Sequence, residues 1–138
     1  MLTHTPDHAP SYYAASCNRS LTLPALEGEV QVDVCIIGGG FTGLNTAIEL
    51  RQRGLTVALV EAHRIGWGAS GRNGGQLING ISGLGKVAKA AGQGAEDLLW
   101  DLGWRGNAIV RERVERYGID CDLKDGFAEV AGGFVLVE

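Results

Sequence analysis

The pattern of apolar residues predicts a strand–helix–strand unit near the start of the chain. Residues 32–37 read Val-Asp-Val-Cys-Ile-Ile, and residues 56–60 read Thr-Val-Ala-Leu-Val. Short apolar runs of this kind are typical of strands that are buried on both faces of a parallel sheet. Between them, residues 44–53 carry apolar positions at helical spacing and end before Gly54, a residue that often terminates helices. Cys35 is therefore expected to be a small core residue.

Two further helices are predicted in the second half of the chain. Residues 86–91 suit a short helix. Residues 95–117 keep apolar positions at i, i+3 and i+4 spacing, with arginine and glutamate filling a solvated face. Gly103 and Gly106 are expected to weaken the middle of this helix, and Gly118 to end it.

A β-hairpin is predicted after the long helix. Residues 119–123 alternate between apolar and polar positions like a strand, and the Asp-Gly pair that follows favours a turn. Residues 127–130 would form the return strand. For residues 132–138 two interpretations stay open, a third strand or an aberrant tail.

Composition narrows the classes to which the chain can belong. At 138 residues it has the size of one domain. The net charge of −4 argues against nucleic acid as a partner. Three widely spaced cysteines form neither a disulfide framework nor a metal-site pattern, so a cytoplasmic location is expected. The sequence also shows no export signal and no apolar run long enough for a membrane span.

Glycine is the compositional outlier, with 22 of 138 residues against a usual share of about 7%. The first cluster, Gly38-Gly39-Gly40-Phe41-Thr42-Gly43, has the spacing G-x-G-x-x-G between the predicted strand and helix. In a dinucleotide-binding fold, Gly38 permits the tight turn, Gly40 lets the backbone approach a pyrophosphate, and Gly43 lets the helix pack close to the strand. The N-terminus of the helix then attracts the phosphates.

An acidic residue follows at the position expected for ribose binding. Glu61 ends the second strand, 18 residues after Gly43, and its carboxylate can accept hydrogen bonds from a ribose diol. The same charge repels a 2′-phosphate, so NADP is disfavoured, although nearby Arg64 weakens that exclusion. FAD and NAD both remain open on this evidence.

A second glycine cluster favours FAD. Residues 68–76 read Gly-Ala-Ser-Gly-Arg-Asn-Gly-Gly-Gln, where an NAD-linked Rossmann dehydrogenase would run directly into its next helix. Together with residues 32–61, this segment resembles the D-amino-acid-oxidase-type (DAO) FAD-dependent oxidoreductases, most of all their gamma-glutamylputrescine oxidoreductase branch. The similarity covers residues 11–130 and includes the Ser-Tyr-Tyr-Ala-Ala-Ser of the N-terminal arm.

The resemblance implies an α/β fold with a Rossmann-like βαβ FAD-binding region and a set of cofactor contacts. The glycines of the first cluster would hold the pyrophosphate, Glu61 would bind the adenosine ribose, and the residues from Ser70 onward would run toward the flavin. The implied FAD-binding residues are Gly38, Gly40, Phe41, Thr42, Gly43, Glu61, Ala62, His63, Ser70, Arg72, Asn73, Gly74, Gly75 and Gln76.

The resemblance also implies the reaction. In the family, FAD accepts a hydride from the carbon beside an amine nitrogen, and the substrate is a small amine or amino acid. We expect no catalytic residue in this chain and no metal. We divide the chain into an N-terminal arm (residues 1–30), an FAD-binding region (31–118) and the start of a substrate domain or an aberrant tail (119–138).

The chain is expected to be an N-terminal piece, because the family's proteins are several hundred residues long. By itself it should neither hold FAD tightly nor oxidise an amine. An inactive truncated product and an NAD-linked Rossmann dehydrogenase domain remain the alternatives. The sequence carries no information on the oligomeric state.

Overall fold

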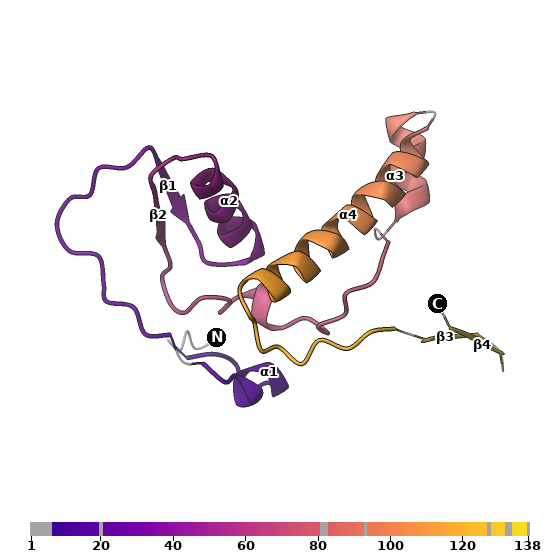
Figure 1. Cartoon of the computed structure of the whole chain (residues 1–138), viewed down its shortest axis with the longest axis horizontal. Coiled ribbons are helices and arrows are strands. Elements are labelled where there is room, and N and C mark those ends of the chain that lie inside the picture. Colours follow the sequence, from indigo (N-terminus) through magenta and orange to yellow (C-terminus); the bar gives the residue numbers. More distant parts are fainter. Residues whose placement is uncertain are drawn as a thin grey trace, which may run out of the picture. The chain divides into compact units, whose positions relative to one another are not determined.

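The computed structural model describes residues 7–19, 21–80, 83–92, 94–126, 128–131 and 134–137. The chain divides into two compact units, Met1–Gly74 and Gly75–Glu138. Figure 1 labels the helices and strands of each unit.

The first unit is built on a parallel βαβ arrangement. Strand β1 (Val34–Ile37) leads through the glycine cluster into helix α2 (Phe41–Gln52), and strand β2 (Val57–Val60) follows. The two strands pair in parallel, from Val34 opposite Val57 to Ile37 opposite Val60. The predicted strand–helix–strand unit is thus confirmed, although α2 begins three residues earlier than the sequence indicated.

Helix α2 covers one face of this sheet and packs against both strands. A Cβ added to Gly43 in the first turn of α2 would collide with the carbonyl oxygen of Gly38 and lie 3.3 Å from Ile36 Cγ2. A glycine is therefore required for the helix to lie this close to the strand.

The opposite face of β1 is exposed, so the prediction of burial on both faces is wrong for this structure. Val34 and Ile36 are half-buried, whereas Cys35 and Ile37 are exposed, with Ile37 at 88%. Successive side chains of a strand point to opposite faces, and α2 lies over one of them. The expectation that Cys35 is a core residue is wrong for the same reason, because its thiol is free and exposed.

A side-chain clamp joins the two strands where they begin. Thr56 donates hydrogen bonds from its backbone N–H and its hydroxyl to Asp33 Oδ2, both at 2.7 Å. The backbone N–H of Asp33 donates in return to Thr56 Oγ1 at 2.9 Å. Hydrogen bonds from the Thr56 side chain, and then from its backbone, lower the pKa of the Asp33 carboxyl.

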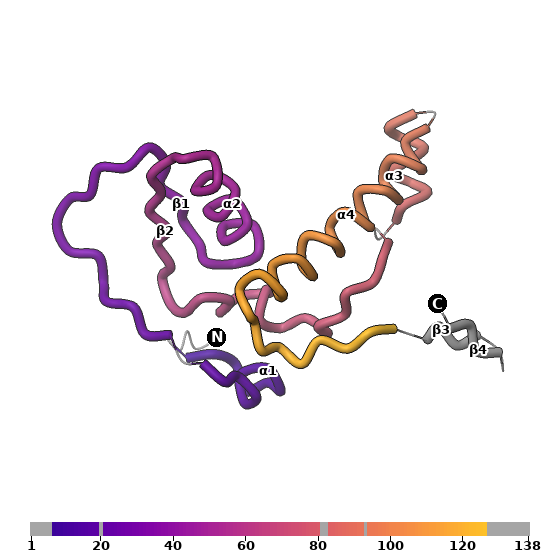
Figure 2. Tube along the Cα trace, in the orientation of Figure 1, coloured from indigo at the N-terminus to yellow at the C-terminus, as the bar shows by residue number. Residues whose placement is uncertain are grey.

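The N-terminal arm contains one short helix that the sequence analysis did not predict, α1 (Tyr12–Ser16). The Ser11 hydroxyl accepts a hydrogen bond from the Ala14 N–H at 3.2 Å and so caps its first turn. Residues 21–33 then run without helix or strand to the start of β1 (Figure 2).

The second unit contains two helices that pack against each other, α3 (Leu84–Ala91) and α4 (Ala95–Arg116). Both were predicted, and α4 continues through Gly103 and Gly106. A Cβ added to Gly103 would collide with the side-chain oxygen of Asn79. The Asn79 amide thus occupies the space that a side chain at position 103 would fill. The side-chain nitrogen and oxygen of Asn79 are buried without a hydrogen-bond partner among the described residues.

The hairpin lies further along the chain than predicted. Strand β3 (Ala128–Ala131) pairs antiparallel with β4 (Phe134–Val137). The predicted strand at residues 119–123 is wrong, because residues 119–126 form no strand. The predicted return strand is found in part as β3, while Phe127 lies outside the described residues. Residues 134–137 form strand β4, whereas residues 132, 133 and 138 lie outside the described residues.

The backbone of residues 119–126 departs from strand geometry at Asp122. Asp122 has a left-handed backbone (φ 52°), and Lys124 forms an ion pair with its carboxylate. Asp125 is bound back to Arg111 of α4 at 2.6 Å. Aspartate is depleted in strands, whereas β4 reads Phe-Val-Leu-Val.

Within the described residues, no helix is long and apolar enough to cross a membrane.

We predict that Gly43→Ala destabilises the protein by about 1–3 kcal/mol, the usual range for overpacking. The new Cβ would push α2 away from the Gly38 carbonyl. The matched control is Gly106→Ala in α4, where an added Cβ meets nothing within 4 Å. This change should be neutral or stabilising by about 0.5–1 kcal/mol. Urea unfolding followed by circular dichroism measures both, and equal effects would contradict the packing assignment.

We also predict that Asp33→Asn lowers the stability at neutral pH. A carboxyl whose pKa is lower in the folded state stabilises the fold above its unfolded pKa, and the contribution is lost as the pH falls through the folded pKa. The loss of unfolding free energy in the variant, relative to the unchanged protein, should therefore become smaller below about pH 4. Thermal unfolding from pH 3 to 7 measures this, with exposed Glu29→Gln as control. If the stability lost in Asp33→Asn is the same at every pH, the result would argue against the hydrogen bonds between Asp33 and Thr56.

Candidate functional site

The centre of the candidate site is the glycine turn between β1 and α2. Gly38 has φ +104°, a conformation that residues with a side chain rarely adopt. Its N–H donates to the Val60 carbonyl at 2.8 Å, so the turn begins directly at the end of the sheet. Gly39, which follows, is buried. The turn therefore connects the end of the sheet directly to the first turn of α2.

Gly40 is the N-cap residue of α2 and has no side chain with which to cap the helix. A Cβ added there would lie 2.9 Å from the Ser70 hydroxyl oxygen. The same hydroxyl accepts a hydrogen bond of 2.9 Å from the Phe41 N–H. The second glycine cluster thus reaches the N-terminus of α2 through Ser70, and the glycine at position 40 leaves room for this close approach.

The carboxylate of Glu61 ties the end of β2 to the glycine turn. Its Oε2 accepts a hydrogen bond from the Gly39 N–H at 2.7 Å, and its Oε1 accepts one from the His63 N–H at 2.9 Å. The bond from Gly39, followed by that from His63, lowers the pKa of the Glu61 carboxyl. Glu61 therefore carries its negative charge at neutral pH, beside the backbone of the turn.

The second glycine cluster forms a short 3-10 turn, η1 (Ala69–Gly71), which presents Ser70. The Asn73 side-chain amide donates to the Ser70 carbonyl at 2.8 Å. A Cβ added to Gly71 would collide with the carbonyl oxygen of Gly66. The cluster is thus held in place by close backbone contacts and by the Asn73 amide.

In the loop that joins β2 to η1, the Trp67 ring contacts the side chains of two other residues. Its ring lies 4.3 Å from the His63 ring, centroid to centroid. The Arg72 guanidinium lies 4.9 Å from the Trp67 ring centroid, and Arg72 Nε donates to the Trp67 carbonyl at 3.3 Å. Two predicted FAD-binding side chains therefore contact a residue for which the sequence analysis had assigned no role.

The structure brings most of the predicted site residues together within the first unit. Ala62 and Thr42 lie beside Glu61 and Phe41 in the chain, and Gly74 ends the unit. Gly75 and Gln76 belong to the second unit, so the structure does not place them relative to the others.

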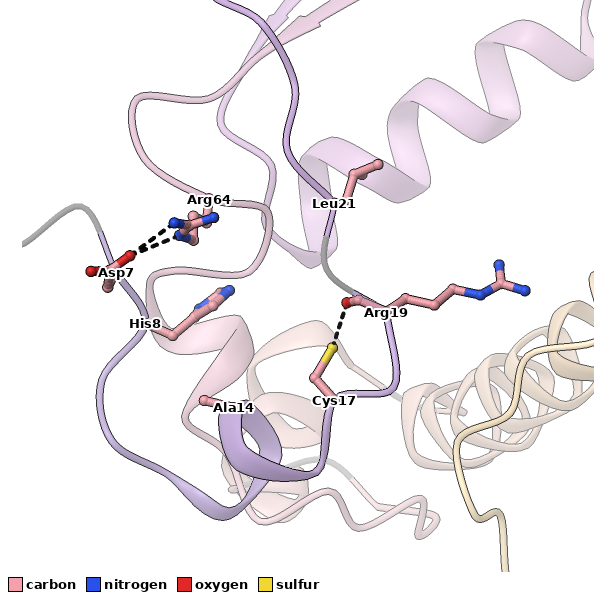
Figure 3. Close-up of a pocket in the computed structure, with 7 residues that line it drawn as sticks. All are labelled: Asp7, His8, Ala14, Cys17, Arg19, Leu21 and Arg64. Carbon is pink, nitrogen blue, oxygen red and sulfur yellow. Dashed lines mark hydrogen bonds and ion pairs between the residues drawn. The ribbon is translucent and has the colours of Figure 1, made fainter.

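A pocket of about 320 Å³ lies elsewhere in the first unit, between the N-terminal arm and Arg64 (Figure 3). It is lined by Asp7, His8, Ala14, Cys17, Arg19, Leu21 and Arg64. None of these residues was predicted to bind FAD. The sequence could not have indicated the contact between Asp7 and Arg64, because 57 positions separate them and no pattern links them.

Among the described residues, no group of three or more His, Cys, Asp or Glu side chains is placed to hold a metal ion.

Comparison with known proteins gives the family. The family model described as DAO, FAD dependent oxidoreductase, matches residues 33–133. The chain is 44% identical over 126 residues to the gamma-glutamylputrescine oxidoreductase of Escherichia coli, and 42% identical over 126 residues to the probable oxidoreductase OrdL of Haemophilus influenzae. Each match covers 91% of this chain, but only 30% and 29% of the respective relative. No solved structure matches the chain.

The resemblance inferred from the two glycine clusters is thereby confirmed, and with it FAD as the cofactor of the family. The matched region contains β1, α2, β2 and both glycine clusters, the elements that form the site. The chain belongs to the DAO family of FAD-dependent oxidoreductases.

Proposed function

We propose that the first unit of this chain holds the dinucleotide part of FAD, in an oxidoreductase that oxidises the C–N bond of a small amine or amino acid to an imine. The main observation behind the proposal is that side chains from two different segments converge on one glycine turn. The Glu61 carboxylate reaches the Gly39 N–H, and the Ser70 hydroxyl reaches the Phe41 N–H. The family match supports FAD over NAD as the dinucleotide.

The residues of the turn fit a pyrophosphate. Gly40 offers backbone without a side chain at the start of α2, and the helix N-terminus carries a partial positive charge that favours phosphate. The Ser70 hydroxyl oxygen lies 2.9 Å from the point where a Cβ on Gly40 would be, so it is placed to contact a phosphate oxygen bound beside the turn. Gly38, Phe41, Thr42 and Gly43 complete this part of the proposed site.

Glu61 fits the ribose. An ionised carboxylate offers roughly four lone-pair positions, and the N–H groups of Gly39 and His63 take one on each oxygen. The Ala62 N–H also bonds to the carboxylate, more weakly, so at least one position remains for a ribose hydroxyl. Ala62 and His63 would lie on the adenine side, with Arg72, Asn73, Gly74, Gly75 and Gln76 toward the flavin.

When bound, FAD supplies the hydride acceptor, and the protein contributes binding and orientation. The choice of an amine substrate rests on similarity to a relative named gamma-glutamylputrescine oxidoreductase. Because the chain spans about 30% of that relative's length, the activity of the whole protein is part of the proposal. So is a cytoplasmic location, which the three free cysteines support.

We predict that Gly40→Val abolishes FAD binding, because the side chain would fill the space needed for the phosphate and would collide with Ser70. Titration with FAD, followed by quenching of flavin fluorescence, measures this. Gly85→Val is the matched control, because an added Cβ there meets nothing within 4 Å. Weak but saturable binding by the unchanged chain is expected, since it is not expected to hold FAD tightly, and a complete absence of binding would contradict the proposed function. Undiminished binding by the Gly40 variant would contradict the assignment of the turn.

We predict that Glu61→Gln weakens binding of ADP, the adenosine half of FAD, by about 1–3 kcal/mol, because charge-assisted hydrogen bonds to the ribose are lost. Since the Glu61 pKa lies below its usual value, this loss should be constant from pH 6 to 8. Calorimetric titration at two pH values tests both points. Glu49→Gln, on exposed α2 surface, is the control. Equal ADP affinity in the Glu61 variant would show that the carboxylate only braces the turn.

A further inference from the structure

The N-terminal arm reaches the loop after β2 through Asp7. Arg64 donates two hydrogen bonds to Asp7 Oδ1, from Nη2 at 2.8 Å and from Nε at 3.2 Å. The Trp67 indole N–H donates to the Asp7 backbone carbonyl at 2.9 Å. Figure 3 shows Asp7 and Arg64 pointing toward each other, with the arm passing beside the loop. Asp7 of the arm thus binds two residues of the loop, Arg64 and Trp67.

The residues that Asp7 holds lie among predicted FAD contacts. Arg64 follows His63 directly, and the Trp67 ring contacts both the His63 ring and the Arg72 guanidinium. His63 in turn donates its N–H to Glu61. A chain of contacts therefore runs from the arm through Trp67 to the residues on either side of the Ser70 turn.

We infer that Asp7 is a positioning residue for the dinucleotide site, and that the arm holds the loop from His63 to Arg72 in the shape that binds the cofactor. This inference rests on the proposed function. Asp7 itself does not contact the cofactor. It acts by fixing the Trp67 ring, against which His63 and Arg72 are placed, and by directing the Arg64 guanidinium to the arm.

The expected effect is modest. The side chains of Arg64 and Asp7 are 37% and 72% exposed, and exposed ion pairs contribute little to stability. The indole N–H bond adds to the ion pair and gives a direct spectroscopic signal. We expect Asp7→Ala to raise the Kd for FAD about three- to fivefold and to leave the fold intact.

The experiment combines binding with exchange of the indole proton. NMR of the full chain follows the Trp67 indole N–H, assigned with Trp67→Phe, and FAD titration gives the Kd. Asp7→Ala keeps the backbone carbonyl that accepts the indole bond but removes the ion pair that holds the arm at the loop, so it should speed exchange of that proton indirectly and raise the Kd. Arg64→Ala should do the same, and the double variant should be no worse than either single variant, since both act through one contact. Asp7→Glu should restore part of the affinity, while Glu29→Ala, in the same arm, should change nothing.

The outcomes separate this inference from the proposed function. Saturable FAD binding by the unchanged chain, with the Kd and exchange rate unaltered in both single variants, would overturn the positioning role alone. Additive effects of the two substitutions would also overturn it. Failure of the unchanged chain to bind FAD at all would overturn both. Circular dichroism excludes unfolding, and if Asp7→Ala does not fold, Arg64→Ala tests the same contact from the loop side.

Discussion

The close approach of α2 to β1 is the constraint on which the rest of the site depends. Gly43 lies against the Gly38 carbonyl with no room for a side chain, and this contact fixes the start of the helix beside the end of the sheet. Only then can Glu61, at the end of the neighbouring strand, reach the Gly39 N–H, and Ser70 the Phe41 N–H. A local backbone requirement thus determines where the side chains of two separate segments meet the backbone of the glycine turn.

The βαβ unit could be predicted from the sequence because its signals are local and agree with one another. Apolar strands, glycines at fixed spacing and a terminal acid all lie within residues 32–61. The burial of that unit could not be predicted. Apolar composition indicates that a strand can be buried on both faces, but whether it is buried depends on what packs there, as Cys35 and Ile37 show.

The hairpin was misplaced because two local signals competed. Alternation and an Asp-Gly pair favour a hairpin over residues 119–130, yet Asp122 adopts a left-handed backbone that interrupts a strand there. The candidate site likewise has a part that the sequence predicts and a part that it does not. Its glycines and Glu61 could be found by spacing, whereas the contacts of Asp7 with Arg64 and Trp67 join distant positions and leave no trace in the sequence.

Gly103 shows how a helix position can be misread when it is considered by itself. Judged by helix propensity, a glycine inside α4 costs about 1 kcal/mol relative to alanine and would be an obvious target for engineering a more stable helix. In the folded unit the missing methyl group is the space that Asn79 occupies. An alanine there would gain helix propensity but would require the Asn79 side chain to leave this space. The two glycines of α4 are therefore not equivalent in design, since an added Cβ meets the Asn79 side chain at Gly103 and nothing within 4 Å at Gly106.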